Sequence, residues 1–177
     1  FFGTAEYLAA QVETALPQET AYVVLDLKRV NELDHTGARV IQQLHGTLAR
    51  EGKRLLVYVG QDGCPYCKKL MTANFSQRAI VDKTRKHFVA IALNLWGDRE
   101  TTWIDGRTMS EKALSRALDI QFTPSILFLD ERGSVVVRLD GYYPPRQCEA
   151  VLDYVAGRHE GRELLSDWLK RVAKEPA

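Results

Sequence analysis

Two cysteines, Cys64 and Cys67, stand where a predicted β-strand gives way to a predicted helix, and this junction constrains the fold most strongly. Residues 55–59, LLVYV, form a short apolar run typical of a buried parallel strand. The sequence GQDGCPYCKKLM follows at once, and Pro65 suits a first helical turn because an N–H there would have no partner. A strand that delivers a Cys-x-x-Cys pair to the start of a helix is typical of a redox site.

Three interpretations of the pair are open: a redox dithiol, half of a metal site, or two buried cysteines without chemistry. A helix N-terminus favours thiolate over thiol, so Cys64 would be the activated sulfur, and Cys67 lies nearly one turn later. A zinc site needs about four ligands. The other Cys and His residues show no second metal-binding spacing; they are His35, His45, His87, Cys148 and His159. The pattern favours a redox pair, with no metal and no cofactor beyond a Cys64–Cys67 disulfide.

Charge and hydropathy argue against two classes of partner. The 177 residues include 24 basic and 23 acidic side chains, for a net charge of +1. Such a balance provides no field that would attract nucleic acid or an anionic membrane. No apolar run approaches the roughly 18 to 20 residues of a spanning helix. We therefore expect no nucleic acid and no membrane contact.

The remaining pattern predicts an α/β fold. Apolar runs predict strands at residues 22–27, 55–59, 87–93, 125–129 and 135–139. Helical spacing predicts helices at residues 8–16, 36–51, from the cysteines to about Lys86, and at 110–118, 147–155 and 160–172. We expect one continuous domain with a central mixed sheet of about five strands and helices on both faces. The strand at 55–59 should be central, and that at 135–139 should lie at an edge.

Several motifs resemble the thioredoxin superfamily in the order in which that superfamily has them. CPYC at residues 64–67 is similar to the active site of glutaredoxins, and FTPS at 122–125 is similar to the superfamily's cis-proline loop. The stretches NLWGD (94–98), WIDG (103–106) and GYY (141–143) resemble the SoxW-like group of thioredoxin-related proteins. The resemblance covers about residues 53–157 and implies a thioredoxin-like fold.

The resemblance also implies roles for individual residues. Cys64 would be the attacking thiol and Cys67 the resolving thiol. Substrate would contact the loop that faces them, with a cis peptide before the proline; the implied contacts are Pro65, Tyr66, Thr123 and Pro124. One position departs from the thioredoxin pattern, because Tyr58 stands where thioredoxins carry a buried aspartate.

Residues 1–57 resemble a different family, the STAS domain of sulfate-transporter tails and anti-sigma-factor antagonists. The resemblance rests on FFGT at the start and on VLDLKRVNELDHTGA at residues 24–38. We expect residues 1–52 to supply an added helix and the first β-α unit of the sheet, residues 53–157 to form the redox core, and residues 158–177 to form a C-terminal helical extension.

Two tryptophans and a third cysteine leave further questions. Trp96 and Trp103 lie in the polar insertion 94–108, which is either a substrate lip near the cysteines or a loop held down by its own aromatic residues. Cys148 lies on a predicted C-terminal helix, where a small buried hydrophobe is expected.

Together these features predict a thiol–disulfide oxidoreductase that reduces or exchanges disulfides of protein or small-thiol substrates. An electron-donating reductase or glutathione would be its redox partner. The alternative is a STAS-type module that binds a protein or nucleotide and uses its cysteines to sense redox state. The two resemblances imply different compartments, because STAS modules are cytoplasmic whereas SoxW-like proteins are commonly exported to the periplasm.

Overall fold

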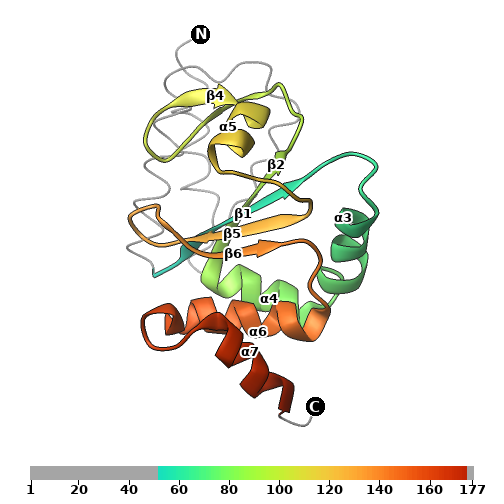
Figure 1. The fold of residues 1–177 in the computed structure, drawn as a ribbon, viewed down its shortest axis with the longest axis vertical. Helices are drawn as coiled ribbons and strands as arrows, with labels where there is room; N and C mark the ends of the chain where they lie inside the picture. The colour runs from blue at the N-terminus through green and yellow to red at the C-terminus, as the bar shows by residue number, and fades with distance from the viewer. Residues whose placement is uncertain (1–51, 175–177) are drawn as a thin grey trace, which may run out of the picture.

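The computed structural model describes residues 52–174 (Figure 1). The strand expected at 22–27 and the helices expected at 8–16 and 36–51 lie outside the described residues. The elements, in chain order, are β1 (Arg54–Gly60), α3 (Pro65–Lys69), the π-helix η2 (Leu70–Asn74), α4 (Arg78–His87), β2 (Phe88–Asn94), β3 (Glu100–Thr102), β4 (Thr108–Ser110), α5 (Glu111–Ala117), β5 (Ser125–Leu129), β6 (Val135–Asp140), α6 (Pro145–Ala156), the 3-10 helix η3 (His159–Gly161) and α7 (Leu165–Lys174).

A mixed sheet with the strand order β2-β1-β5-β6 forms the centre of the fold. β1 runs parallel to β2 and antiparallel to β5, which in turn pairs antiparallel with β6. The predicted α/β class is confirmed, as are the interior position of residues 55–59 and the edge position of residues 135–139. The described sheet has four strands where about five were expected, and the remaining expected strand is the one outside the described range.

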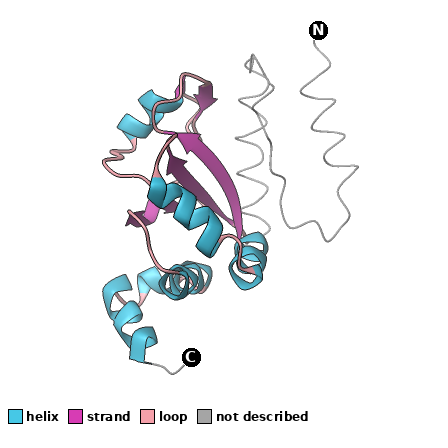
Figure 2. Cartoon of the chain, turned by 90° about the vertical axis from the view of Figure 1, so that its right-hand side faces the viewer, coloured by secondary structure: helices cyan, strands magenta, loops and turns pink. Residues whose placement is uncertain are grey.

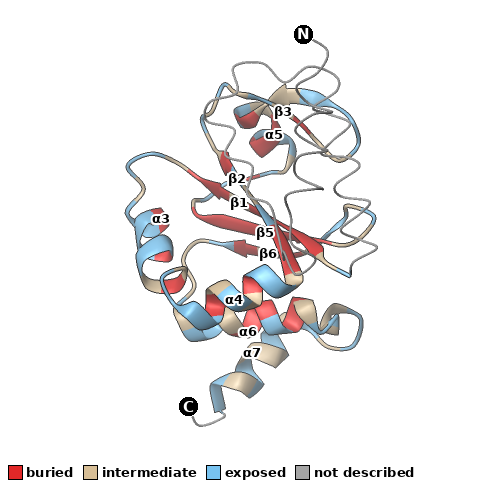
Figure 3. Cartoon of the chain, turned by 180° about the vertical axis from the view of Figure 1, so that it is seen from behind, coloured by how far each residue is buried: buried red, intermediate tan, exposed pale blue. Residues whose placement is uncertain are grey.

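Alternation along the strands divides the core into two layers, one on each face of the sheet. Leu56 and Phe128 point to the face covered by α4 and α6, where Val151 packs against them. Val57 and Leu127 point to the opposite face, which α5 covers. Figure 2 shows the strands between these helical layers, and Figure 3 shows that the two inner strands, β1 and β5, are almost entirely buried. Helices therefore lie on both faces, as predicted.

The long helix expected from the cysteines to about Lys86 is interrupted, so that prediction was wrong. After α3 the helix continues as the wider π-helix η2 and ends at Asn74. A new helix, α4, begins at Arg78. Ser76 Oγ donates to the Thr72 carbonyl oxygen at 2.7 Å, and Gln77 Nε2 donates to the Ala73 oxygen at 2.9 Å. These side chains take the acceptors that a continuing helix would use.

Two other segments also differ from their predicted form. The insertion at 94–108 contains β3, which pairs antiparallel with β4 in a small second sheet. The C-terminal helix begins at Leu165 rather than near Glu160, after the 3-10 turn η3. Gly157 and Gly161 disfavour a continuous helix there, and the reversal brings Trp168 onto α6, where its indole N–H donates to the Ala150 oxygen at 2.9 Å.

Candidate active site

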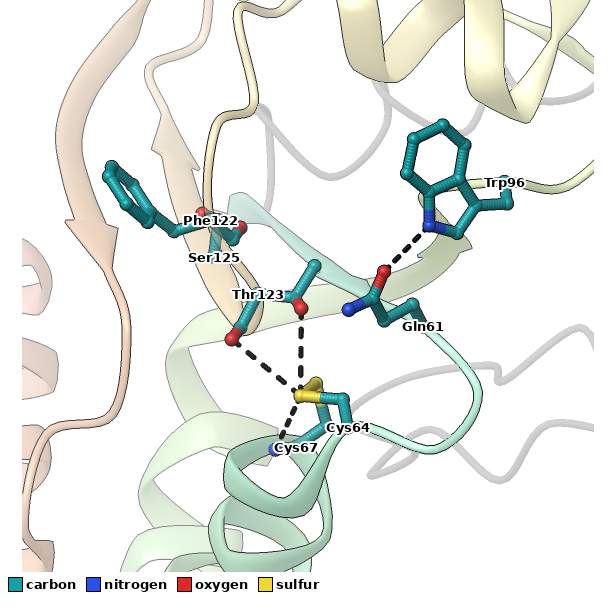
Figure 4. Close-up of a disulfide and its surroundings, with 7 residues drawn as sticks. All are labelled: Gln61, Cys64, Cys67, Trp96, Phe122, Thr123 and Ser125. Carbon is teal, nitrogen blue, oxygen red and sulfur yellow. Dashed lines mark hydrogen bonds between the residues drawn. A yellow bond between two sulfur atoms is a disulfide. The ribbon is translucent and has the colours of Figure 1, made fainter.

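Cys64 lies at the point where the loop after β1 enters α3. It is the N-cap of this short helix, Pro65 is the first helical residue, and Cys64 forms a disulfide with Cys67 (Figure 4). Gly63, with φ of +72°, provides the left-handed turn that leads into the cap. Cys64 is half-exposed, whereas Cys67 is only 6% exposed. A sulfur on an incoming molecule can therefore reach Cys64 more readily than Cys67.

Hydrogen-bond donors converge on the sulfur of Cys64. The Cys67 N–H donates to Cys64 Sγ at 3.0 Å, and Thr123 Oγ1 lies 3.5 Å from the same sulfur. The carbonyl oxygen of Thr123 lies 3.6 Å from it (Figure 4). In the dithiol form both donors would stabilise a thiolate on Cys64, since hydrogen bonds to a charged form favour that form.

The Thr123 loop reaches the cysteines from across the sheet. The peptide bond between Thr123 and Pro124 is cis, as predicted, and Pro124 is buried. Gly141 N–H donates to the Pro124 oxygen at 2.8 Å, which ties the loop to the end of β6. Ser125 Oγ lies 2.8 Å from the Phe122 oxygen and 2.9 Å from a carboxylate oxygen of Asp140. Ser125 ends the FTPS stretch, but its pairing with Asp140 was not predicted, because β-strand patterning does not reveal a polar pair across a ladder.

This arrangement agrees with a family match. The thioredoxin-like domain family matches residues 42–156, about two thirds of the chain. The chain belongs to the thioredoxin-like domain family. The STAS domain family matches residues 1–63, so the two matches overlap over residues 42–63, which include β1 and the loop that follows it. No curated protein is significantly similar to the chain.

Solved structures support the same fold for this thioredoxin-like domain. A thioredoxin-fold protein from Helicobacter pylori is 24% identical with a TM-score of 0.56, covering 70% of this chain and 86% of its own. A thioredoxin from Thermus thermophilus is 23% identical with a TM-score of 0.51, covering 68% of this chain and 88% of its own.

Pro65 and Tyr66, the two residues between the cysteines of the thioredoxin-like domain, are both exposed. The Tyr66 ring stacks on Tyr142, with centroids 6.4 Å apart. The ammonium of Lys69 lies 4.6 Å from the centroid of the Tyr142 ring and forms a cation–π contact with it. The structure thus brings Cys64, Cys67 and Thr123 together, and it places Tyr66 beside the GYY segment.

The third cysteine is separated from this site by burial. Cys148, on α6, is 3% exposed, as expected for a small buried hydrophobe. Burial raises the pKa of its thiol, and the Asn74 side chain offsets only part of this rise. Asn74 is itself fully buried and donates from Nδ2 to the Tyr143 oxygen at 2.9 Å, joining η2 to the segment before α6. Sequence patterning did not single out Asn74.

Tyr58 occupies the position at which thioredoxins carry a buried aspartate. It is half-buried, and burial raises the pKa of its hydroxyl. Its hydroxyl lies over Gly60, where an added Cβ would overlap it. A tyrosine that stays protonated near neutral pH cannot act as a carboxylate base, so this position does not supply a carboxylate proton relay.

Residues 52–174 contain neither a cluster of metal ligands nor a membrane-spanning helix. In this range no three His, Cys, Asp or Glu side chains are grouped closely enough to hold a metal ion. Across the same residues no helix is long and apolar enough to cross a membrane.

Proposed function

We propose that this protein is a thiol–disulfide oxidoreductase in which Cys64 and Cys67 carry the electron pair. The observation that most supports the proposal is the Cys64–Cys67 disulfide at a helix N-terminus, with its outer sulfur facing Thr123. Family membership agrees with this chemistry. No bound cofactor is needed, because two thiols and a disulfide differ by two electrons and two protons.

In the reducing direction, the Cys64 thiolate attacks one sulfur of a substrate disulfide. A bond forms between Cys64 and that sulfur, the substrate S–S bond breaks, and the leaving sulfur takes up a proton. The Cys67 thiol then loses its proton and attacks Cys64 Sγ, which releases the second substrate thiol and restores the Cys64–Cys67 disulfide. The substrate gains two electrons and two protons, and a dithiol reductant or two glutathione molecules restore the enzyme. Oxidation of a substrate dithiol follows the same steps in reverse.

The direct test is a disulfide-reduction assay with the full chain, dithiothreitol as reductant and insulin as substrate. The wild-type protein should accelerate reduction, and Cys64→Ser should return the rate to the uncatalysed level. A parallel reaction with oxidised glutathione shows whether a small disulfide is also accepted. A wild-type protein that accelerates neither reaction would refute the proposal.

The STAS match supports a second candidate function for residues 1–63, the binding of a protein or nucleotide partner. In that case the cysteine pair would sense redox state without turnover. Acceleration of disulfide exchange by the wild-type protein distinguishes the two, because a binding module with a sensing pair would react once and stop.

A further inference from the structure

Trp96 is held firmly while its side chain remains exposed. The Trp96 N–H donates to Asn94 Oδ1 at 3.0 Å, and the indole N–H donates to Gln61 Oε1 at 2.7 Å (Figure 4). The neighbouring Leu95 N–H donates to the Gly60 oxygen at 2.7 Å. Despite these bonds, Trp96 is 68% exposed. The loop therefore presents a large apolar ring at a fixed position.

Contacts that do not involve the apolar face of the Trp96 ring also anchor the loop. Glu111, a buried residue at the start of α5, accepts from Arg99 Nη2 at 2.5 Å and from the Asn94 N–H at 3.3 Å. Gly97 packs against the Glu111 carboxylate so closely that an added Cβ would overlap it. Trp103 is half-buried and packs against the core layer under α5. Trp103 thus anchors the insertion through apolar packing, whereas the Trp96 ring stays exposed to solvent.

Trp96 lies close to the redox pair. Its partner Gln61 lies three residues before Cys64 on the same loop. In Figure 4, Trp96 lies on one side of Thr123 and Cys64, and Phe122 lies on the other. Phe122 is 63% exposed, and Tyr66, between the cysteines, is 58% exposed. Single exposed apolar residues are normally scattered over a protein surface. Several exposed aromatic residues grouped around a reactive group therefore indicate a contact surface.

We propose that Trp96 is a specificity-determining residue that packs against an apolar side chain next to the cysteine of a polypeptide disulfide. This inference rests on the proposed function and names the substrate feature that the site selects. The chemistry of the rim favours such a substrate over glutathione, whose two carboxylates need cationic partners. The rim side chains Tyr66, Trp96 and Phe122 are uncharged aromatics, and the Lys69 ammonium is engaged on the Tyr142 ring.

The proposal is tested with two disulfide peptides of equal length and charge, one with Leu and one with Ser beside each cysteine. Trp96→Ala should lower kcat/KM for the Leu peptide about tenfold, the effect of losing one aromatic contact, and mainly by raising KM. The same variant should change kcat/KM for the Ser peptide and for oxidised glutathione by less than about twofold. Trp96→Phe keeps an aromatic ring but loses the bond to Gln61, so it should recover about threefold of the tenfold loss.

Two further variants test whether the position of the ring matters and whether any exposed apolar side chain would act in the same way. Gln61→Ala frees the indole without removing it, and it should reduce the preference for the Leu peptide by about threefold. Leu164, on the segment leading into α7, is 70% exposed, and Leu164→Ala should leave the preference unchanged. Unaltered circular dichroism and thermal midpoints verify that each variant is folded.

The outcomes separate the two proposals. Equal losses on all three substrates, or none on the Leu peptide, would overturn the role of Trp96 while leaving the oxidoreductase function intact. A wild-type protein that reacts with none of the three would instead refute the oxidoreductase function on which the inference rests.

Discussion

At the scale of single residues, the two bonded cysteines have different surroundings. Cys64 is half-exposed and faces two donors, whereas Cys67 is buried inside the first turn. We predict that, after reduction, iodoacetamide labels Cys64 first, and at pH values well below about 8.5, the pKa of an ordinary thiol. The measurement is alkylation across pH followed by mass mapping.

Single substitutions should divide the reaction into its steps. Cys67→Ser should still attack a substrate disulfide but stall as a mixed disulfide on Cys64, detectable by mass. Cys148→Ser serves as the control and should leave labelling of Cys64 unchanged, because burial raises the pKa of the Cys148 thiol and keeps it protonated. Earlier labelling of Cys67 or Cys148 would contradict the assignment of Cys64 as the nucleophile.

The sequence predicted the features of this site that depend on neighbouring residues, and it missed most of the contacts between distant segments. The helix cap at Cys64 depends on neighbours within four residues, so local rules predict it. Thr123 could be placed opposite Cys64 only through the family resemblance, because 59 residues separate them. The supports at Gln61, Ser125 and Asp140 are side-chain pairs between distant segments, and no periodic pattern marks such pairs.

At the scale of elements, long and strongly patterned segments were predicted well and short ones were not. The β5–β6 hairpin was predicted because two apolar runs flank Glu131-Arg-Gly133. β3 and β4, with three residues each, are too short to show an alternation of period two. The interruption between η2 and α4 was missed because polar side chains at Thr72, Ser76 and Gln77 do not break the helical apolar spacing.

The β5–β6 turn and the insertion meet at Gly133, and this contact leads to a stability prediction. Gly133 has φ of +83°, and an added Cβ would overlap the Ile104 side chain. Gly106 has φ of +85° but no atom near the place of an added Cβ. Gly106→Ala should cost about 1 kcal/mol from the left-handed backbone alone. Gly133→Ala should cost about 1 kcal/mol more, because Ile104 must move.

Urea unfolding of both variants measures the difference. Ile104 packs against the core, so Ile104→Ala has a cost of its own. Measured in the Ile104→Ala background, Gly133→Ala should cost no more than Gly106→Ala, since the overlapping side chain is then absent. Equal destabilisation by Gly133→Ala and Gly106→Ala would show that Ile104 does not restrain the turn.

At the scale of the whole molecule, a buried arginine joins segments that are far apart in sequence. Arg54, at the start of β1, is 6% exposed and donates to the Val155 oxygen at 3.0 Å. It also pairs with Glu160 at 2.5 Å and with Glu131 at 3.6 Å. One side chain therefore connects the central strand, the β5–β6 turn and the segment after α6. The prediction that residues 1–52 complete this domain as a first β-α unit concerns residues outside the described range and stays a prediction.

The Arg54 cluster should make stability depend on pH in a defined direction. Burial by itself would raise the pKa of Glu131, but a backbone hydrogen bond and the guanidiniums of Arg158 and Arg54 outweigh it, so the pKa is lowered. A lowered folded-state pKa stabilises the fold above the unfolded value, about 4.3, and this contribution is lost as pH falls through the folded value. Glu131→Gln should therefore cost about 1 to 2 kcal/mol at pH 7, a discounted value for a pair with one partly exposed partner.

Comparison of the two proteins across pH isolates this contribution from that of the other carboxylates. The difference in free energy of unfolding between wild type and Glu131→Gln should be largest near pH 7. It should shrink below about pH 4.3, where Glu131 takes up a proton in the unfolded state, and it should vanish below the lower folded-state pKa, where Glu131 is protonated in both states. Glu100→Gln, at an exposed position on β3, is the matched control and should change the free energy of unfolding only slightly. Urea unfolding at several pH values, with the m-value checked at each, provides the data.

The difference in free energy of unfolding between wild type and Glu131→Gln could instead stay constant from neutral to acidic pH. That result would mean that the ion pairs of Glu131 with Arg54 and Arg158 do not stabilise the fold. This end of the domain would then be held by the Arg54 hydrogen bond to Val155 and by apolar packing.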